Sequence, residues 1–155
     1  KIFFGKELNT EILSQLNKNK IKFETVTHEP AKTSEESATL RNTKLDEGIK
    51  AIILRGKKTG KNIMVCIPAD QKLDMNLLAN FETEKFEFEN PQIIKDKFGL
   101  ELGSIPPFGN LLGMTTYFSR EIESKAVSAF NDGLNIESIK MKPADVIKLI
   151  SPIFI

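Results

Sequence analysis

The sequence predicts a single α/β domain of the α+β type, in which helices pack on a mixed β-sheet. Two apolar runs, 48–55 and 62–68, are typical of strands, and the glycine- and lysine-rich segment 56–61 between them predicts a hairpin. Residues 8–19 and the segment that follows Pro143 carry leucine, isoleucine and valine at helical spacing. Because helices and strands do not alternate regularly, a mixed sheet is favoured over a doubly wound parallel one.

The other elements are predicted from local signals. Thr33 and Glu36 have capping-box spacing, Asn90 and Pro91 are typical of a helix start, and Ser119 is expected to cap a brief helix. A further helix is expected to pass through Leu77 and Leu78. Further strands are predicted at 22–27, 81–89, 111–113, 115–118, 127–130 and 136–141.

Composition limits the range of partners. The chain has 155 residues, of which 40% are hydrophobic and 28% charged, as expected for one globular domain over 1–155. No apolar run approaches the length of a membrane span, so no membrane partner is expected. The net charge of +1 does not fit a protein that grips long nucleic acid, so DNA is not expected and any RNA contact should be local.

Two further features bear on where the chain acts. Cys66 is the only cysteine, so no internal disulfide is expected, and a reducing compartment, the cytoplasm, is the predicted location. The chain begins at Lys1 rather than at methionine, as expected of a trimmed chain or of a domain cut from a longer protein.

The loop from Gly103 to Gly109 is the first candidate site. Pro106 and Pro107 each fix φ near −65°, and Ile105 is pushed towards an extended conformation because a proline follows it. A stiff loop bounded by glycines can hold backbone N–H groups against a phosphate or an oxyanion. Since many such loops only connect two elements, a purely structural role is the alternative.

Three side chains are singled out along the chain. His28, the only histidine, could act as a general base or serve as a hydrogen-bonded structural group at a strand end. Lys50 lies in an apolar strand, where it either points to solvent or faces inward and needs partners. Cys66 is expected to be a small buried hydrophobe.

The available chemistry is limited. One histidine and one cysteine cannot build a histidine-rich metal site, and a catalytic triad is possible only through His28. No P-loop or Gly-x-Gly-x-x-Gly run is present. An enzyme built from these residues would depend on positioning, backbone donors and one lysine.

The order of motifs resembles the YbaK/ProX family of aminoacyl-tRNA deacylases, relatives of the editing domain of bacterial prolyl-tRNA synthetases. The matching pieces are His28-Glu29-Pro30, Thr33-Ser34-Glu35-Glu36, Gly48-Ile49-Lys50-Ala51, Asp70 with Lys72-Leu73-Asp74, the loop from Gly103 to Gly109, Phe130-Asn131-Asp132-Gly133, and Ser138-Ile139-Lys140-Met141 with Asp145. They cover almost the whole chain. Each is weak alone, but their order and spacing together are fairly specific.

The resemblance implies a mixed, barrel-like sheet flanked by helices. It also implies hydrolysis, without a metal or other cofactor, of the ester that joins a wrong amino acid to the terminal ribose of tRNA, typically proline tRNA. The acceptor end of tRNA would be the partner, with a prolyl-tRNA synthetase in cis or in trans. Alanine is the first expectation for the amino acid removed, with cysteine and serine as the others.

The resemblance also assigns residues. Gly103 to Pro107 looks like the family's Gly-x-x-x-Pro loop, and Lys50 falls at the family's essential lysine. Asn131 and Asp132 fall where the family lines its amino-acid pocket.

Physical chemistry fits these assignments. An aminoacyl ester is already activated, so orientation and stabilisation of the oxyanion would suffice. Backbone N–H groups of Gly103, Ser104 and Ile105 are the expected donors, because Pro106 and Pro107 have none. We therefore expect Lys50 and Gly103 to be catalytic.

The expected substrate-binding residues are His28, Ser104, Ile105, Pro106, Pro107, Gly109, Asn131 and Asp132. Two alternatives remain on sequence grounds. One is a catalytically inactive tRNA-binding or assembly domain appended to a synthetase, and the other is a deacylase of a small acyl ester unconnected with tRNA.

Overall fold

The structure is a computed structural model that describes residues 2–155, so Lys1 lies outside the described residues. The helices are α1 (Gly5–Lys18), α2 (Ser34–Arg41), α3 (Pro91–Phe98) and α4 (Pro143–Ile150), with short 3-10 segments η1 (Leu45–Glu47), η2 (Met75–Asn80), η3 (Gly109–Leu112) and η4 (Arg120–Ser124). The strands are β1 (Phe23–Thr27), β2 (Ile49–Gly56), β3 (Asn62–Pro68), β4 (Phe86–Phe88), β5 (Thr115–Phe118), β6 (Ser128–Asn131), β7 (Glu137–Met141) and β8 (Ile153–Phe154).

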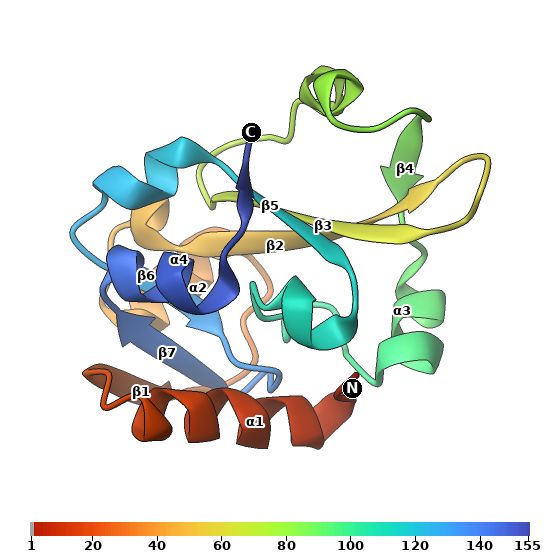
Figure 1. Ribbon diagram of the computed structural model, residues 1–155. Helices are drawn as coiled ribbons and strands as arrows, with labels where there is room; N and C mark the ends of the chain where they lie inside the picture. The colour runs from red at the N-terminus through yellow and green to blue at the C-terminus, as the bar shows by residue number, and fades with distance from the viewer. Residues whose placement is uncertain (1) are drawn as a thin grey trace.

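The strands form two sheets. A three-stranded antiparallel sheet has the order β1-β7-β6, and a five-stranded mixed sheet has the order β4-β2-β3-β5-β8. The β2–β3 hairpin crosses the middle of the molecule, and α1 runs along one edge beside β1 and β7 (Figure 1). One parallel bridge, between Gly48 and Ala129, links the sheets. The predicted mixed α/β architecture is confirmed, although the strands form two linked sheets and not one closed barrel.

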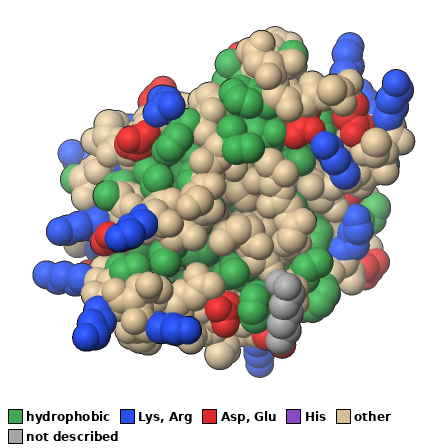
Figure 2. All heavy atoms as spheres, viewed as in Figure 1, with side chains coloured by type: hydrophobic (Ala, Val, Ile, Leu, Met, Phe, Trp, Pro, Cys, Tyr) green, Lys and Arg blue, Asp and Glu red, His purple; other side chains and the backbone are tan. Residues whose placement is uncertain are grey.

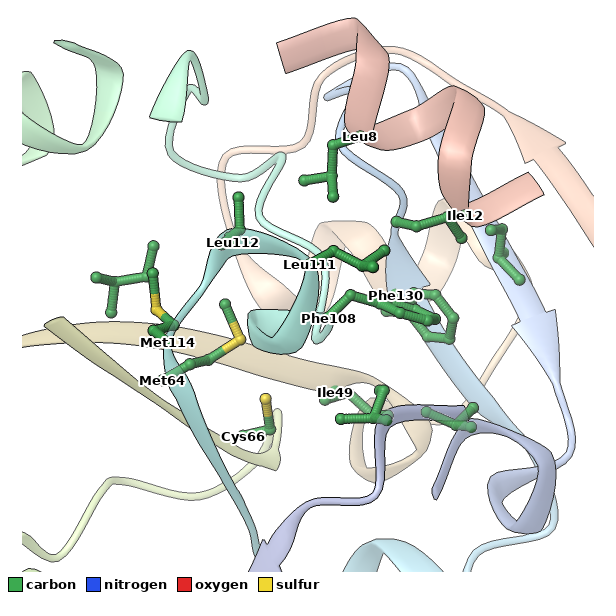
Figure 3. Close-up of a cluster of buried hydrophobic side chains, with 14 of the residues drawn as sticks. Leu8, Ile12, Ile49, Met64, Cys66, Phe108, Leu111, Leu112, Met114 and Phe130 are labelled. Atoms are coloured by element: carbon green, nitrogen blue, oxygen red, sulfur yellow. The ribbon is translucent and has the colours of Figure 1, made fainter. Parts of the chain in front are cut away.

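The main core lies between α1 and both sheets. Leu8, Ile12 and Leu16 are fully buried along one face of α1, as their helical spacing predicts. Figure 3 shows Leu8 and Ile12 beside the cluster that contains Phe108 and Phe130, whose ring centroids lie 5.8 Å apart. Burial of each such side chain contributes about 1.5–3 kcal/mol to the free energy of unfolding. This core fixes the positions of β2 and the loop before η3.

The structure corrects several predicted elements. Residues 111–113, predicted as a strand, belong to η3 and its end, because the Leu111 N–H donates to the Phe108 carbonyl at 3.0 Å and Gly113, with φ of +75°, ends the turn. The predicted strand 81–89 is reduced to β4, and the helix expected after residue 74 is the 3-10 segment η2. Strand β8, which sequence analysis missed, pairs in parallel with β5.

The surface carries no dominant patch of one charge on the face shown in Figure 2. Lysine and arginine side chains are spread around the rim of this face with acidic side chains among them. None of the helices within residues 2–155 combines the length and apolar character that a membrane crossing requires.

Candidate functional site

A cavity of about 240 Å³ lies between α2, the beginning of β2 and the loop before η3. Small side chains form much of its wall. Its lining is made of Ala31, Lys32, Thr33, Ser34, Ser37, Ala38, Arg41, Leu45, Gly48, Ile49, Lys50, Ala51, Ala69, Leu102, Gly103, Ile105 and Asn131.

Local sequence signals place the two elements that flank this cavity. The Thr33 side chain accepts a hydrogen bond from the Glu36 N–H at 3.1 Å, so α2 begins where the capping spacing predicts. A Cβ on Gly48 would lie 3.2 Å from Ala69 Cβ and 3.4 Å from Arg41 Nη1. A side chain at position 48 would therefore be tightly packed where α2 and the start of β2 approach each other.

Lys50 occupies the wall of this cavity. Strand alternation sends the neighbouring Ile49 into the core and leaves Lys50 half-buried on the other face of β2. Its ammonium group donates to the backbone carbonyl of Gln71 at 2.7 Å. Within residues 2–155 it forms no ion pair, so two of its three N–H donors remain for a ligand.

Arg41, which sequence analysis did not single out, is a buried cation in the same wall. Its residue is 6% exposed, and burial lowers its pKa to about 10, so the guanidinium stays charged at neutral pH. Its Nε donates to Ser138 Oγ at 2.8 Å and its Nη2 donates to Asn131 Oδ1 at 2.7 Å. Among the described side chains no carboxylate pairs with it, and its Nη1 has no hydrogen-bond partner.

His28 supports this network from outside the cavity. Because a carbonyl can only accept, Nδ1–H donates to the Glu29 carbonyl at 2.8 Å. Nε2 forms a hydrogen bond with the Ser138 hydroxyl at 2.7 Å. Ser138 thus connects His28 to Arg41, and the expected contribution of His28 to substrate binding stays a prediction.

The proline loop reaches the cavity at two of its residues. Gly103, with φ of +86°, and Ile105 line the wall, and their N–H groups donate to no partner within residues 2–155. The Ser104 N–H instead donates to the Glu101 carbonyl at 3.1 Å, so it is not free for a ligand. The expected set of backbone donors is thereby reduced to Gly103 and Ile105.

The other predicted loop residues lie behind the cavity wall. Ser104 is 2% exposed and its hydroxyl donates to the Glu101 carbonyl at 2.7 Å. Pro106, Pro107 and Gly109 are buried and do not line the cavity. These four residues hold the loop in place, so their contribution to substrate binding stays a prediction.

Asn131 and Asp132 are adjacent in sequence, but only Asn131 reaches the cavity. Asn131 lines the cavity, accepts from Arg41 and donates to the Leu134 carbonyl at 3.0 Å. Asp132 is fully buried and outside the lining, and neither of its carboxyl oxygens accepts a hydrogen bond of normal geometry within the described chain. Burial, followed by the neighbouring Glu137 carboxyl, raises the pKa of Asp132 to about 8.

The charged residues of the cavity lining are all basic. Lys32, Arg41 and Lys50 contribute positive charge, and no acidic residue belongs to the lining described above. Such a cavity favours phosphate or a developing oxyanion. Within residues 2–155 no group of three or more histidine, cysteine, aspartate or glutamate side chains is placed to hold a metal ion.

The fold agrees with comparison to known proteins. The model of the aminoacyl-tRNA editing domain family matches residues 28–149, and the chain belongs to that family. It is 28% identical to the Multifunctional Ser/Thr-tRNA deacylase ProXp-y of Escherichia coli (strain K12) over 156 residues, covering 96% of this chain and 91% of that protein. It is 23% identical to the Prolyl-tRNA editing protein ProX of Acetoanaerobium sticklandii over 144 residues, covering 90% and 88%.

Among solved structures, the chain is similar to a candidate trans-editing enzyme for prolyl tRNA synthetase. The TM-score is 0.77 with 14% sequence identity, covering 95% of this chain and 94% of that one. At this identity the likeness shows the fold. Together with the family match, it confirms the predicted editing deacylase at the level of fold and enzyme class.

Proposed function

We propose that the chain hydrolyses the ester of a small amino acid mischarged on tRNA, with the acceptor end bound at the cavity around Lys50. The observation that carries this proposal is an unpaired lysine beside two free backbone donors, Gly103 and Ile105, in a small basic cavity. Proline tRNA and a synthetase partner in cis or in trans stay predictions. The cytoplasm, where tRNA is charged, is the expected location.

The proposed reaction needs no protein nucleophile. Water attacks the ester carbonyl, a C–O bond to water forms, and the oxyanion that develops accepts from the N–H groups of Gly103 and Ile105. The bond to the ribose oxygen then breaks, and the proton lost by water is transferred to that oxygen. Lys50 holds the terminal ribose or phosphate, so the ester carbon is presented to the loop.

The size and polarity of the cavity favour a small side chain that bears a hydroxyl group. Ala38, Ala51 and Ala69 line about 240 Å³, which disfavours large side chains. Arg41 and Asn131 supply polar groups at one wall. Serine or threonine therefore fits better than alanine, the first expectation from sequence, and the similarity to the Ser/Thr-tRNA deacylase of E. coli supports this order.

A single-turnover deacylation panel tests the proposal. Serine, threonine, alanine and cysteine would each be charged on proline tRNA, with correctly charged proline on the same tRNA as the control. We expect seryl or threonyl ester to be lost fastest, because the hydroxyl can bond to the polar wall at Arg41 and Asn131, and prolyl ester to be spared, because its ring offers no hydroxyl there. Release at the spontaneous rate for every ester would contradict the proposal and favour a non-catalytic domain.

The Arg41→Gln variant tests how the side chain is selected. A hydrogen bond to a charged donor contributes about 1.5–3 kcal/mol, so loss of the guanidinium should lower the ratio of seryl to alanyl hydrolysis by ~10-fold or more. The matched control is Arg120→Gln, at a side chain that is 73% exposed. An equal fall in both rates would mean that Arg41 only supports the fold.

A further inference from the structure

A second cavity of about 620 Å³ adjoins the candidate site. The two cavities share Lys50, Ala51, Leu102 and Ile105, so they meet along β2 and the loop before η3. In contrast to the first cavity, the walls of the second are mainly apolar and come from β2, β4 and α3. We call this second cavity the β4 groove.

Two large hydrophobic side chains of the β4 groove face solvent. Phe88, at the end of β4, is 65% exposed, and Leu102 is 61% exposed. Exposed hydrophobic side chains that share one hollow are typical of a ligand-binding groove. The remaining apolar wall, including Leu73 and Ile94, extends this surface into the groove.

Charge at the β4 groove favours a ligand with a phosphate. Lys50 lies where the two cavities meet, and Lys72, on the lining, forms no ion pair within residues 2–155. The acidic residue of the lining, Glu89, is 5% exposed and already engaged. It accepts from Asn62 Nδ2 at 2.9 Å and lies 3.8 Å from Arg55 Nε.

We propose that the β4 groove binds the base of the terminal nucleoside that carries the aminoacyl ester, with one face of the base against Phe88. This inference rests on the proposed function. The ester and the base are attached to the same ribose, so a cavity that holds the ester must adjoin the surface that receives the base. The β4 groove adjoins it at Lys50, and aromatic and aliphatic side chains are the usual partners of unstacked bases.

The composition of the groove indicates how the base is recognised. The walls at Ile52, Leu73 and Ile94 offer no side-chain donor or acceptor for the edge of a base. An aromatic ring can stack on any of the four bases, whereas telling one base from another needs hydrogen bonds to its edge. Lys50 and Lys72 are the charged donors of the lining that we assign to phosphate, and Glu89 is already engaged, so we expect the groove to hold the base mainly by stacking.

Binding of uncharged tRNA that ends in fluorescent 2-aminopurine tests the inference without any hydrolysis. Stacking on an aromatic ring quenches the fluorophore, and stacking losses at single-stranded sites predict that Phe88→Ala weakens binding by ~10-fold or more. Phe88→Tyr keeps the ring and should keep both quenching and affinity. Phe4→Ala, at a phenylalanine that is 51% exposed outside the groove, is the matched control.

Each outcome separates this inference from the proposed function. Equal affinity and quenching for wild type and Phe88→Ala would overturn the groove as the base site, even if the charged tRNA panel shows hydrolysis. Equal weakening by Phe88→Tyr and Phe88→Ala would also overturn it, because the ring would not be the feature that matters. Quenching that depends on Phe88 without hydrolysis of any ester would keep the groove and reject the proposed reaction.

Discussion

At the scale of single residues, the uncommon feature is that two ionisable side chains are buried without a counter-ion among the described residues. Arg41 and Asp132 are both buried, and neither forms an ion pair among the described residues. The two differ in chemistry. Arg41 keeps its charge and offers a free Nη1 to the cavity, whereas Asp132 lies outside the cavity, where the protonated form is favoured.

Asp132 makes stability depend on pH. Its pKa is raised from 3.8 to about 8, so the folded protein binds this proton more tightly than the unfolded chain. The free energy of unfolding should therefore fall as the pH rises from about 4 to about 8. Asp132→Asn should match wild type near pH 4 and exceed its Tm by several degrees at pH 9, since about 1 kcal/mol shifts Tm by ~2–4 °C at this size.

Thermal unfolding at both pH values measures this difference. The exposed Asp70→Asn variant is the control, and its Tm should not diverge from that of wild type between pH 4 and pH 9 in this way. A Tm gap between wild type and Asp132→Asn that is the same at pH 4 and pH 9 would contradict a raised pKa. The Glu137 carboxyl contributes to the raised pKa of Asp132, so Glu137→Gln should narrow the pH range over which the gap opens.

Some site residues could be predicted from sequence and others could not, for physical reasons. Lys50 and Gly103 stand out locally, one as a charge in an apolar strand and the other as a glycine before two prolines. Arg41 at the end of a short polar helix is indistinguishable from a solvated arginine until tertiary packing buries it. For the same reason, the internal hydrogen bond of the Ser104 N–H and the burial of Asp132 had no signal in the sequence.

At the scale of elements, the site depends on close packing beneath the proline loop. Gly109, at the start of η3, is buried, and a Cβ there would overlap Thr116 Oγ1 and lie 3.1 Å from Met64 Cβ. Thr116 itself is 7% exposed and has little room to move. Because Gly109 has no side chain, the segment that follows the proline loop can pack directly against Met64 on β3 and Thr116 on β5.

Gly109→Ala should lower the free energy of unfolding by about 1–3 kcal/mol, the usual cost of overpacking a core. In a Thr116→Ala background the same change should cost less, because the overlapping oxygen is gone. Urea denaturation of the four proteins measures this coupling. Equal costs of Gly109→Ala in both backgrounds would show that contact with Thr116 does not set the requirement for glycine.

Element prediction succeeded where a local pattern and tertiary packing agree. The β2–β3 hairpin, α1 and α3 have periodicity or caps that packing also satisfies. Residues 111–113 failed because adjacent buried leucines read as an apolar strand, although the chain there makes a tight turn ending at Gly113 with φ of +75°. β8 is only two residues long, and its pairing with β5 depends on contact across the fold.

At the scale of the whole molecule, the two sheets meet beside the candidate site. The bridge between Gly48 and Ala129 links them, and Arg41 reaches from α2 to Asn131 on β6. The cavity around Lys50 is thus built from both sheets, α2 and the proline loop, which lie far apart in sequence. The mixed architecture was predicted from the sequence, but the division into two sheets that meet at Gly48 and Ala129 depends on contacts between distant segments, which have no local signature.

Replacement of Lys50 tests the central claim most directly. Single-turnover hydrolysis of the best ester from the panel would be measured for wild type, Lys50→Ala and Lys50→Arg, with Lys57→Ala in the exposed hairpin turn as the control. Since charged hydrogen bonds contribute about 1.5–3 kcal/mol, we expect Lys50→Ala to lower kcat/KM by ~10- to 100-fold, Lys50→Arg to lose less, and Lys57→Ala to keep the wild-type value. Wild-type hydrolysis by a folded Lys50→Ala protein would contradict the assignment of this cavity as the site of ester hydrolysis.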